Sequence, residues 1–199
     1  LSEATKKGYS GVCIYTKENP IKINKSFGSK FFAEEGRFIE VELKTVRIVS
    51  VYFPSGSSGE VRQNLKYKFM EKFEHYMNKV KRTEKPTIIS GDWNIVHKEI
   101  DIKNWKSNQK NSGCLPKERA WLDKIFDEHG FVDAFRAVNN KPHNYTWWSN
   151  RGKSWENNVG WRIDYQVFSP NSKLKVANAK IYKKERFSDH SPLIICYEF

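Results

Sequence analysis

Several side chains that could carry out acid-base chemistry stand at the predicted ends of strands. The apolar run 87–90 is β-favouring, and it stops at Gly91, Asp92 and Asn94, which predicts a buried strand that ends there. Alternation along the strand places Asp92 and Asn94 on the same side of the exit. By itself this stretch is more typical of an Asx turn, in which Asp or Asn binds its own loop backbone.

The same kinds of side chain recur at other predicted strand ends. Tyr52 stands at the end of one apolar run, Asp164 lies within another, and Asp189 and His190 precede the last one. A carboxylate within an apolar strand needs a partner, and an Asp-His pair suits acid-base catalysis as well as a surface pair or a cap. Phosphodiester hydrolysis needs a cation, a base for water and donors for the developing charge. Oxygen ligands without a Cys/His cluster favour Mg²⁺ or Mn²⁺ over zinc.

The elements that must position these residues alternate between short strands and amphipathic helices. Hydrophobic periodicity predicts strands at 11–15, 37–43, 45–53, 131–135 and 163–168, a hairpin formed by the second and third, and a last buried strand after Pro192. Helices are predicted at 60–81 and 116–128, with Gly130 ending the second. The apolar stripe of the first is typical of packing on a sheet, with a membrane or partner surface as the alternative; its residues are Leu65, Phe69, Phe73, Met77 and Val80.

Length and composition favour one globular domain over residues 1–199. The chain has 199 residues, of which 38% are hydrophobic and 29% charged, and no apolar run approaches the length of a membrane span. Lys and Arg exceed Asp and Glu by 35 to 23, which gives a net charge of +12 and suggests a basic face for nucleic acid; charge kept for solubility alone is the other explanation. Cys13, Cys114 and Cys196 form no motif, so we expect a reducing cytoplasm and buried thiols at Cys13 and Cys196.

Three further stretches could contact a polyanion. The Ser/Gly loop 55–59 contains Ser57 and offers backbone amides to phosphate oxygens. The segment 97–114 is too polar for the core, so it is either a solvated loop or a phosphate-binding loop. Four Trp residues fall between 147 and 161, and we expect one or two of them to face a ligand and the others to fill core.

Four segments, 90–94, 108–113, 158–165 and 188–190, resemble in order the signatures of the exonuclease III family of apurinic/apyrimidinic endonucleases. The resemblance extends from about residue 6 to residue 199. It implies an α/β (α+β) fold of the DNase I-like type, a two-sheet β-sandwich flanked by helices in four layers. It also implies a monomeric cytoplasmic enzyme that uses Mg²⁺, or Mn²⁺ in its place, to cut duplex DNA 5′ to abasic sites and to trim 3′ ends.

The resemblance also implies a role for each matching residue. Asp92 would activate water, Asn94 would position it, and Tyr52 would offer its phenol to the phosphate or the leaving oxygen. His190, held by Asp164, would donate to a phosphate oxygen. The implied metal ligands are Asp92, Asn94, Asp189 and His190, and the implied DNA contacts are Ser57, Asn108, Lys110, Asn111, Trp147, Trp161 and Ile163.

The sequence departs from the family at its start. Family members begin with a Trp-Asn motif and continue to a Gln-Glu-Thr motif whose Glu is a main Mg²⁺ ligand, and neither motif occurs here. We therefore expect a fold that is incomplete at the N-terminus, with weak Mg²⁺ binding and weak activity. The alternatives are a catalytically weak DNA-binding fragment and a phosphatase of the same superfamily. The phosphatase is disfavoured by the net charge, by residues 108–111 and by the pocket predicted at Trp161.

Overall fold

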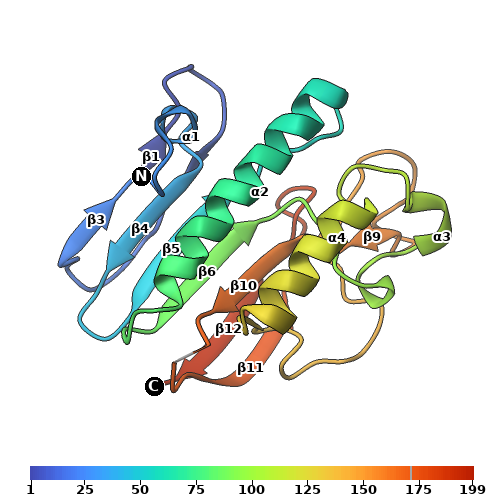
Figure 1. Cartoon of the computed structure of the whole chain (residues 1–199). Coiled ribbons are helices and arrows are strands. Elements are labelled where there is room, and N and C mark those ends of the chain that lie inside the picture. Colours follow the sequence, from blue (N-terminus) through green and yellow to red (C-terminus); the bar gives the residue numbers. More distant parts are fainter. Residues whose placement is uncertain (171) are drawn as a thin grey trace.

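A six-stranded sheet forms the centre of the computed structural model, which describes residues 1–170 and 172–199 (Figure 1). The strands of the sheet lie in the order β3-β4-β5-β6-β10-β7. Strands β5 and β6 are parallel, and the other neighbouring pairs are antiparallel. Their bounds are β3 (Lys22–Asn24), β4 (Phe38–Glu42), β5 (Arg47–Tyr52), β6 (Thr87–Asp92), β10 (Asp164–Phe168) and β7 (Val132–Asp133).

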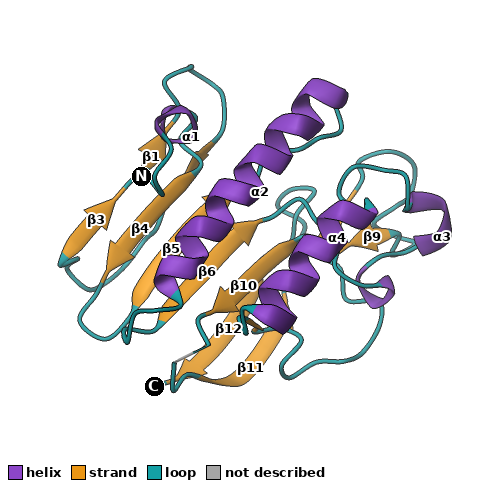
Figure 2. Ribbon diagram, in the orientation of Figure 1, coloured by secondary structure: helices purple, strands orange, loops and turns teal. Residues whose placement is uncertain are grey.

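Two helices cover one face of this sheet (Figure 2). They are α2 (Glu60–Val80) and α4 (Pro116–Asp123), and the latter continues as a π-helical turn over Lys124–Glu128. The predicted apolar stripe of α2 packs into a core with alternate residues of β5 and β6, so its role in core packing is confirmed. No helix in the described part of the chain combines the length and the apolar character needed to cross a bilayer. The short helical elements are α1 (Lys30–Glu34), the 3₁₀ turn Glu99–Asp101 and α3 (Trp105–Asn108).

Small two-stranded sheets complete the molecule. Strand β1 (Ser2–Glu3) pairs with β2 (Gly11–Val12), and β11 (Lys175–Ile181) pairs with β12 (Leu193–Glu198). The β11–β12 pair lies behind β10 in Figure 1, and a second core joins it and Val12 to the other face of the central sheet. The third pair, β8 (Trp147–Trp148) with β9 (Gly160–Trp161), lies beside the strand ends that carry the predicted site. The α/β fold with two packed sheets is thus as expected.

Some local predictions were wrong. The predicted first strand, 11–15, ends at Val12. Strand β11 was not predicted, because its polar residues leave no clear alternation of apolar and polar positions. The last strand is only half-buried, since it pairs with β11 alone. Cys196 on this strand is therefore exposed, and Cys13, which lies beyond the end of β2, is exposed as well, so the prediction of two buried thiols was wrong. Cys114 is the buried cysteine.

The polar segment 97–114 is partly core, contrary to expectation. Asp101 is 1% exposed and accepts hydrogen bonds from the buried guanidinium of Arg162 and from Arg136. Burial opposes ionisation of Asp101, but the two arginines outweigh it and lower the pKa of this carboxyl to about 2. Arg162 also binds Asp133 of β7 at 2.7 Å. This ion network ties the segment to β7 and to Arg162, which connects β9 with β10.

Candidate active site

Strand register brings three of the predicted residues to one end of the central sheet. Tyr52 is the last residue of β5 and pairs with Asp92, the last residue of the parallel strand β6. On the other side of β6, Asp92 pairs with Asp164, the first residue of the antiparallel strand β10. Paired residues on neighbouring strands are about 5 Å apart at their Cα atoms. Tyr52 and Asp164, which are more than 100 positions apart in the chain, therefore lie on either side of Asp92 at the same edge, where these strands end.

Gly91 allows this edge to form. Its φ is +145°, and a Cβ atom added there would lie 1.8 Å from the carbonyl oxygen of Val51. Any larger residue would push β6 away from β5 and separate Tyr52 from Asp92.

The turn after β6 fixes the Asp92–Asn94 pair. The backbone N–H of Asn94 donates to Oδ1 of Asp92 at 2.7 Å, and its side-chain amide donates to Oδ2 at 2.9 Å and to the carbonyl of Phe53 at 3.0 Å. Asn94 has a φ of +52°, a left-handed conformation that Asn tolerates better than most residues. The Asx turn and the proposed site are thus the same structure, because the turn aims both side chains at the strand exit.

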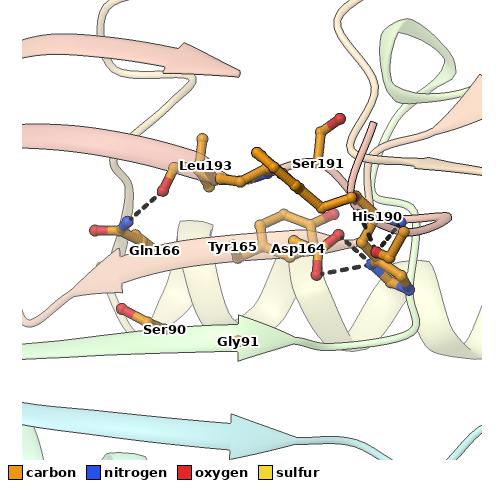
Figure 3. A pocket seen from close by; sticks show the side chains of 11 residues that line it. Ser90, Gly91, Asp164, Tyr165, Gln166, His190, Ser191 and Leu193 are labelled. Carbon is orange, nitrogen blue, oxygen red and sulfur yellow. Dashed lines mark hydrogen bonds and ion pairs between the residues drawn. The ribbon is translucent and has the colours of Figure 1, made fainter. Parts of the chain in front are cut away.

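His190 reaches this edge from the segment before β12. Its Nδ1 atom lies 2.9 Å from Oδ2 of Asp164 and 3.1 Å from Oδ1 (Figure 3). Burial opposes a charge on His190, but the hydrogen bond and charge of Asp164, aided by Asp92 and Asp189, raise the pKa of the imidazole to about 9. At neutral pH the ring is therefore a cation, and Nε2 remains as a donor.

The surroundings of Asp92 disfavour its charged form, whereas those of His190 favour the charged imidazole. Burial and the nearby charge of Asp164 raise the pKa of Asp92 to about 7, although His190, the Asn94 amide and Lys66 act against this rise. Burial and the charge of Asp92 also raise the pKa of the Tyr52 phenol, which keeps it protonated. The edge thus holds a base that titrates near neutrality, a neutral phenol and an imidazolium.

These groups open into one cleft of about 780 Å³. Its other walls come from the Ser55–Gly59 loop, the loop at Lys110–Gly113 and the β8–β9 pair. Most of the predicted residues line it, namely Tyr52, Ser57, Asp92, Asn94, Lys110, Asn111, Trp147, Trp161, Ile163 and His190. Of the four clustered Trp residues, two face the cleft, while Trp148 is 1% exposed and packs against Trp155.

Three predicted residues lie outside the cleft wall. Asn108 braces a wall residue by accepting a hydrogen bond from the Asn111 amide at 2.9 Å. Asp189 accepts a hydrogen bond from the indole of Trp147 at 3.0 Å. Asp164 lies behind His190, in a smaller cavity of about 370 Å³ that His190 also lines (Figure 3). These side chains hold or orient the groups that face the cleft.

The predicted metal ligands do not form a complete coordination site. Within the described residues no group of three or more His, Cys, Asp or Glu side chains is placed to hold a metal ion. Asp92 and Asn94 supply hard oxygens of the type that Mg²⁺ prefers, and burial together with the charge of Asp164 raises the pKa of Asp92. However, both Asp92 oxygens already accept from Asn94, Oδ2 of Asp189 accepts from Trp147, and Nδ1 of His190 faces Asp164.

Sequence reasoning missed several residues of the site. Arg151 lines the cleft from the loop between β8 and β9, and no local pattern distinguishes it from a surface arginine. Thr146 accepts hydrogen bonds from the N–H groups of Ile163 and Asp164, both at 3.1 Å, and so fixes the start of β10. Lys66 is fully buried beneath Asn94. A signal existed for Lys66, because it stands on the apolar stripe of α2, three residues before Phe69 and seven before Phe73.

Comparison with known proteins identifies the family of the chain. The sequence profile described as "Endonuclease/Exonuclease/phosphatase family" matches residues 2–190. The chain is 37% identical over 191 residues to a protein named exodeoxyribonuclease from Bacillus subtilis. The aligned region covers 96% of this chain and 75% of that relative. It is 35% identical over 191 residues to DNA repair nuclease APEX1 from Danio rerio, covering 96% of this chain and 61% of that relative.

Solved structures show the same fold. An AP endonuclease from Archaeoglobus fulgidus superimposes with a TM-score of 0.80 at 24% identity, over 92% of this chain and 72% of that one. A 3′-5′ exonuclease from Neisseria meningitidis superimposes with a TM-score of 0.81 at 22% identity, over 92% and 73% of the two chains. The profile match over most of the chain, together with the identity to the Bacillus protein, shows that the chain belongs to the endonuclease/exonuclease/phosphatase family.

Proposed function

We propose that this chain is a DNA repair nuclease that hydrolyses phosphodiester bonds of duplex DNA, 5′ to abasic sites and at 3′ ends. The single observation that carries the proposal is the shared cleft of Tyr52, Asp92, Asn94 and His190. Nuclease names among the relatives support the same reaction class. We propose residues 1–199 as one domain that acts as a cytoplasmic monomer.

Each group in the cleft has a task that its environment suits. Asp92, whose pKa is about 7, takes a proton from the attacking water, while Asn94 holds that carboxylate and the water in line. His190 donates from Nε2 to a non-bridging phosphate oxygen, and Asp164 keeps the ring charged and oriented. Tyr52 donates its phenolic proton to the phosphate or the leaving oxygen.

The remaining cleft walls suit a DNA backbone and an extruded sugar. Lys110 and Asn111, with Ser57 on the opposite loop, provide a cation and polar donors for phosphates. Asn108 holds Asn111 in place. Trp147, Trp161 and Ile163 form an apolar wall in which the two indole rings pack edge to face at 5.9 Å. Such a wall accepts an abasic sugar that has left the stack.

The family is metal-dependent, and we propose Mg²⁺ as the ion, with Mn²⁺ able to replace it. Asp92 and Asn94, with Asp189 and His190 nearby, are the candidate ligands, but the incomplete donor set predicts weak binding by this chain.

Cleavage of an end-labelled duplex with one abasic site tests the proposal. We expect incision immediately 5′ to the site under single-turnover conditions with excess protein, and a rate that still rises as Mg²⁺ increases through the millimolar range. Full turnover at low Mg²⁺ would show that the donors described above are sufficient for metal binding. Absence of incision at any concentration of Mg²⁺ or Mn²⁺ would favour a non-catalytic DNA-binding chain.

The same assay separates the phosphatase alternative. An inositol phosphate added in excess should leave incision unchanged, because the apolar Trp wall and the Lys110 loop suit DNA better than a small phosphoester. Strong competition together with release of inorganic phosphate would contradict the DNA assignment.

A further inference from the structure

A buried ion pair lies directly beneath two walls of the cleft. Lys66 of α2 and Glu118 of α4 are both 0% exposed, and their charged groups are 2.5 Å apart. Neither residue lines the cleft. Burying two charges is costly, so the pair needs the further hydrogen bonds that satisfy its remaining donors and acceptors.

Those further bonds lead to the cleft. The Nζ atom of Lys66 donates to the carbonyl of Asn94 at 2.6 Å. On the other side, Oε2 of Glu118 accepts from the backbone N–H of Gly113 at 2.7 Å and from that of Leu115 at 3.0 Å. One continuous chain of charge-assisted hydrogen bonds thus joins the Asn94 turn to the loop that carries Lys110.

The two loops that this hydrogen-bond network joins are also in direct contact with each other. A Cβ atom on Gly113 would lie 3.0 Å from the Asn94 carbonyl oxygen and 3.1 Å from the ring of Trp161. Gly113 also accepts a hydrogen bond from the N–H of Val96 at 2.7 Å. A shift of either loop therefore displaces the other.

We infer that Lys66 and Glu118 are positioning residues, which hold Asn94 and the Lys110–Gly113 loop at a fixed separation so that DNA binding and water positioning occur in one geometry. The inference rests on the proposed function for its kinetic consequence. A purely structural pair would instead support folding and leave the chemistry of the folded protein unchanged.

Three variants separate these two roles. Lys66→Met leaves the buried charge of Glu118 without its cation, although Gln63 still donates to Oε1 at 3.0 Å, so the change costs stability as well as position. Lys66→Met combined with Glu118→Gln removes both charges, keeps an acceptor for the Gly113 N–H, and should recover much of that stability. Lys85→Met is the matched control, because Lys85 also binds a carboxylate, that of Glu42 at 2.6 Å, but next to the opposite end of β6.

We expect the double variant to regain thermal stability while its single-turnover rate on the abasic duplex stays below wild type by a factor of about ten or more. Its affinity for the duplex should fall less, because Gly113 keeps its acceptor. The Lys85 control should cleave like the wild type. Recovery of the rate together with stability in the double variant would overturn the inference.

Hydrogen exchange decides the inference separately from the function. In Lys66→Met the Gly113 amide should exchange faster than in the Lys85 control once each rate is compared with the global stability of its own variant, although Lys66 does not touch Gly113. Equal exchange rates would refute the coupling. If the wild type does not cleave DNA, the proposed function fails, and the exchange measurement still tests whether the two loops are coupled.

Discussion

Replacing Asp92 with Asn is expected to lower the single-turnover rate of abasic-site cleavage by about 10³-fold, within the range for loss of a general base. The amide is nearly isosteric and its oxygen can still accept from the backbone N–H of Asn94, so the turn should survive. Its NH2 group cannot accept from the Asn94 side chain or take the proton of the attacking water. The rate should be measured with excess protein at saturating Mg²⁺, so that weak metal binding does not mask the effect. Affinity for duplex DNA should be retained, because the walls that bind the backbone do not change.

The matched control is Asp127→Asn, since Asp127 is exposed near the end of the π-helical turn after α4 and is absent from the cleft wall. That variant should cleave at the wild-type rate. A rate for Asp92→Asn equal to that of the control would mean that no chemistry occurs at this edge of the sheet.

Replacing His190 with Asn should lower the rate by about 10²- to 10³-fold, as expected when a charged donor to the developing negative charge is lost. Asn is of similar size and can hydrogen-bond to Asp164, but it carries no charge. His75→Asn is the control, because His75 is exposed on α2 and binds only the carbonyl of Glu71 among the described contacts. A His190 variant as active as this control would remove the imidazolium from the mechanism.

The pH profile identifies how His190 acts. Its pKa of about 9 means that the charged form is present below pH 9 and is lost as the pH rises through that value, so the wild-type rate should fall on the alkaline side. In Asp164→Asn the charge that raises the pKa of His190 is removed and the hydrogen bond to Nδ1 is left with a neutral acceptor, while burial still lowers the pKa. The alkaline limb should therefore move to lower pH in Asp164→Asn, and an unmoved limb would contradict the pairing.

The sequence was sufficient to predict the strongly periodic elements and the strand ends. Helix α2, the β4–β5 hairpin and β6 have clear alternation or helical spacing, and their bounds differ by few residues from those predicted. Asp92 and Asn94 could be identified because an apolar strand ends directly before them. The weak alternation of β11 and the isolated pairing of β12 could not be anticipated, because they depend on which strands are available as partners.

The site was predicted less completely than the fold. Register alone decides that Tyr52, Asp92 and Asp164 stand side by side, and register depends on long-range pairing that no local window contains. The burial of Lys66 and of Asp101 was not predicted, because only the folded structure provides the partners of these charges. The resemblance to a known family supplied roles for residues whose spacing alone was ambiguous.

The central claim is that DNA binds in the one cleft that holds Tyr52, Asp92, Asn94 and His190. Indole N–H resonances of the Asp92→Asn protein, recorded while an abasic duplex is added, test it most directly. The signals of Trp147 and Trp161, which line the cleft, should shift on binding, while those of Trp93 and Trp121 in the core beneath α2 should not. Binding that shifts the Trp121 signal and leaves those of Trp147 and Trp161 in place would contradict the account.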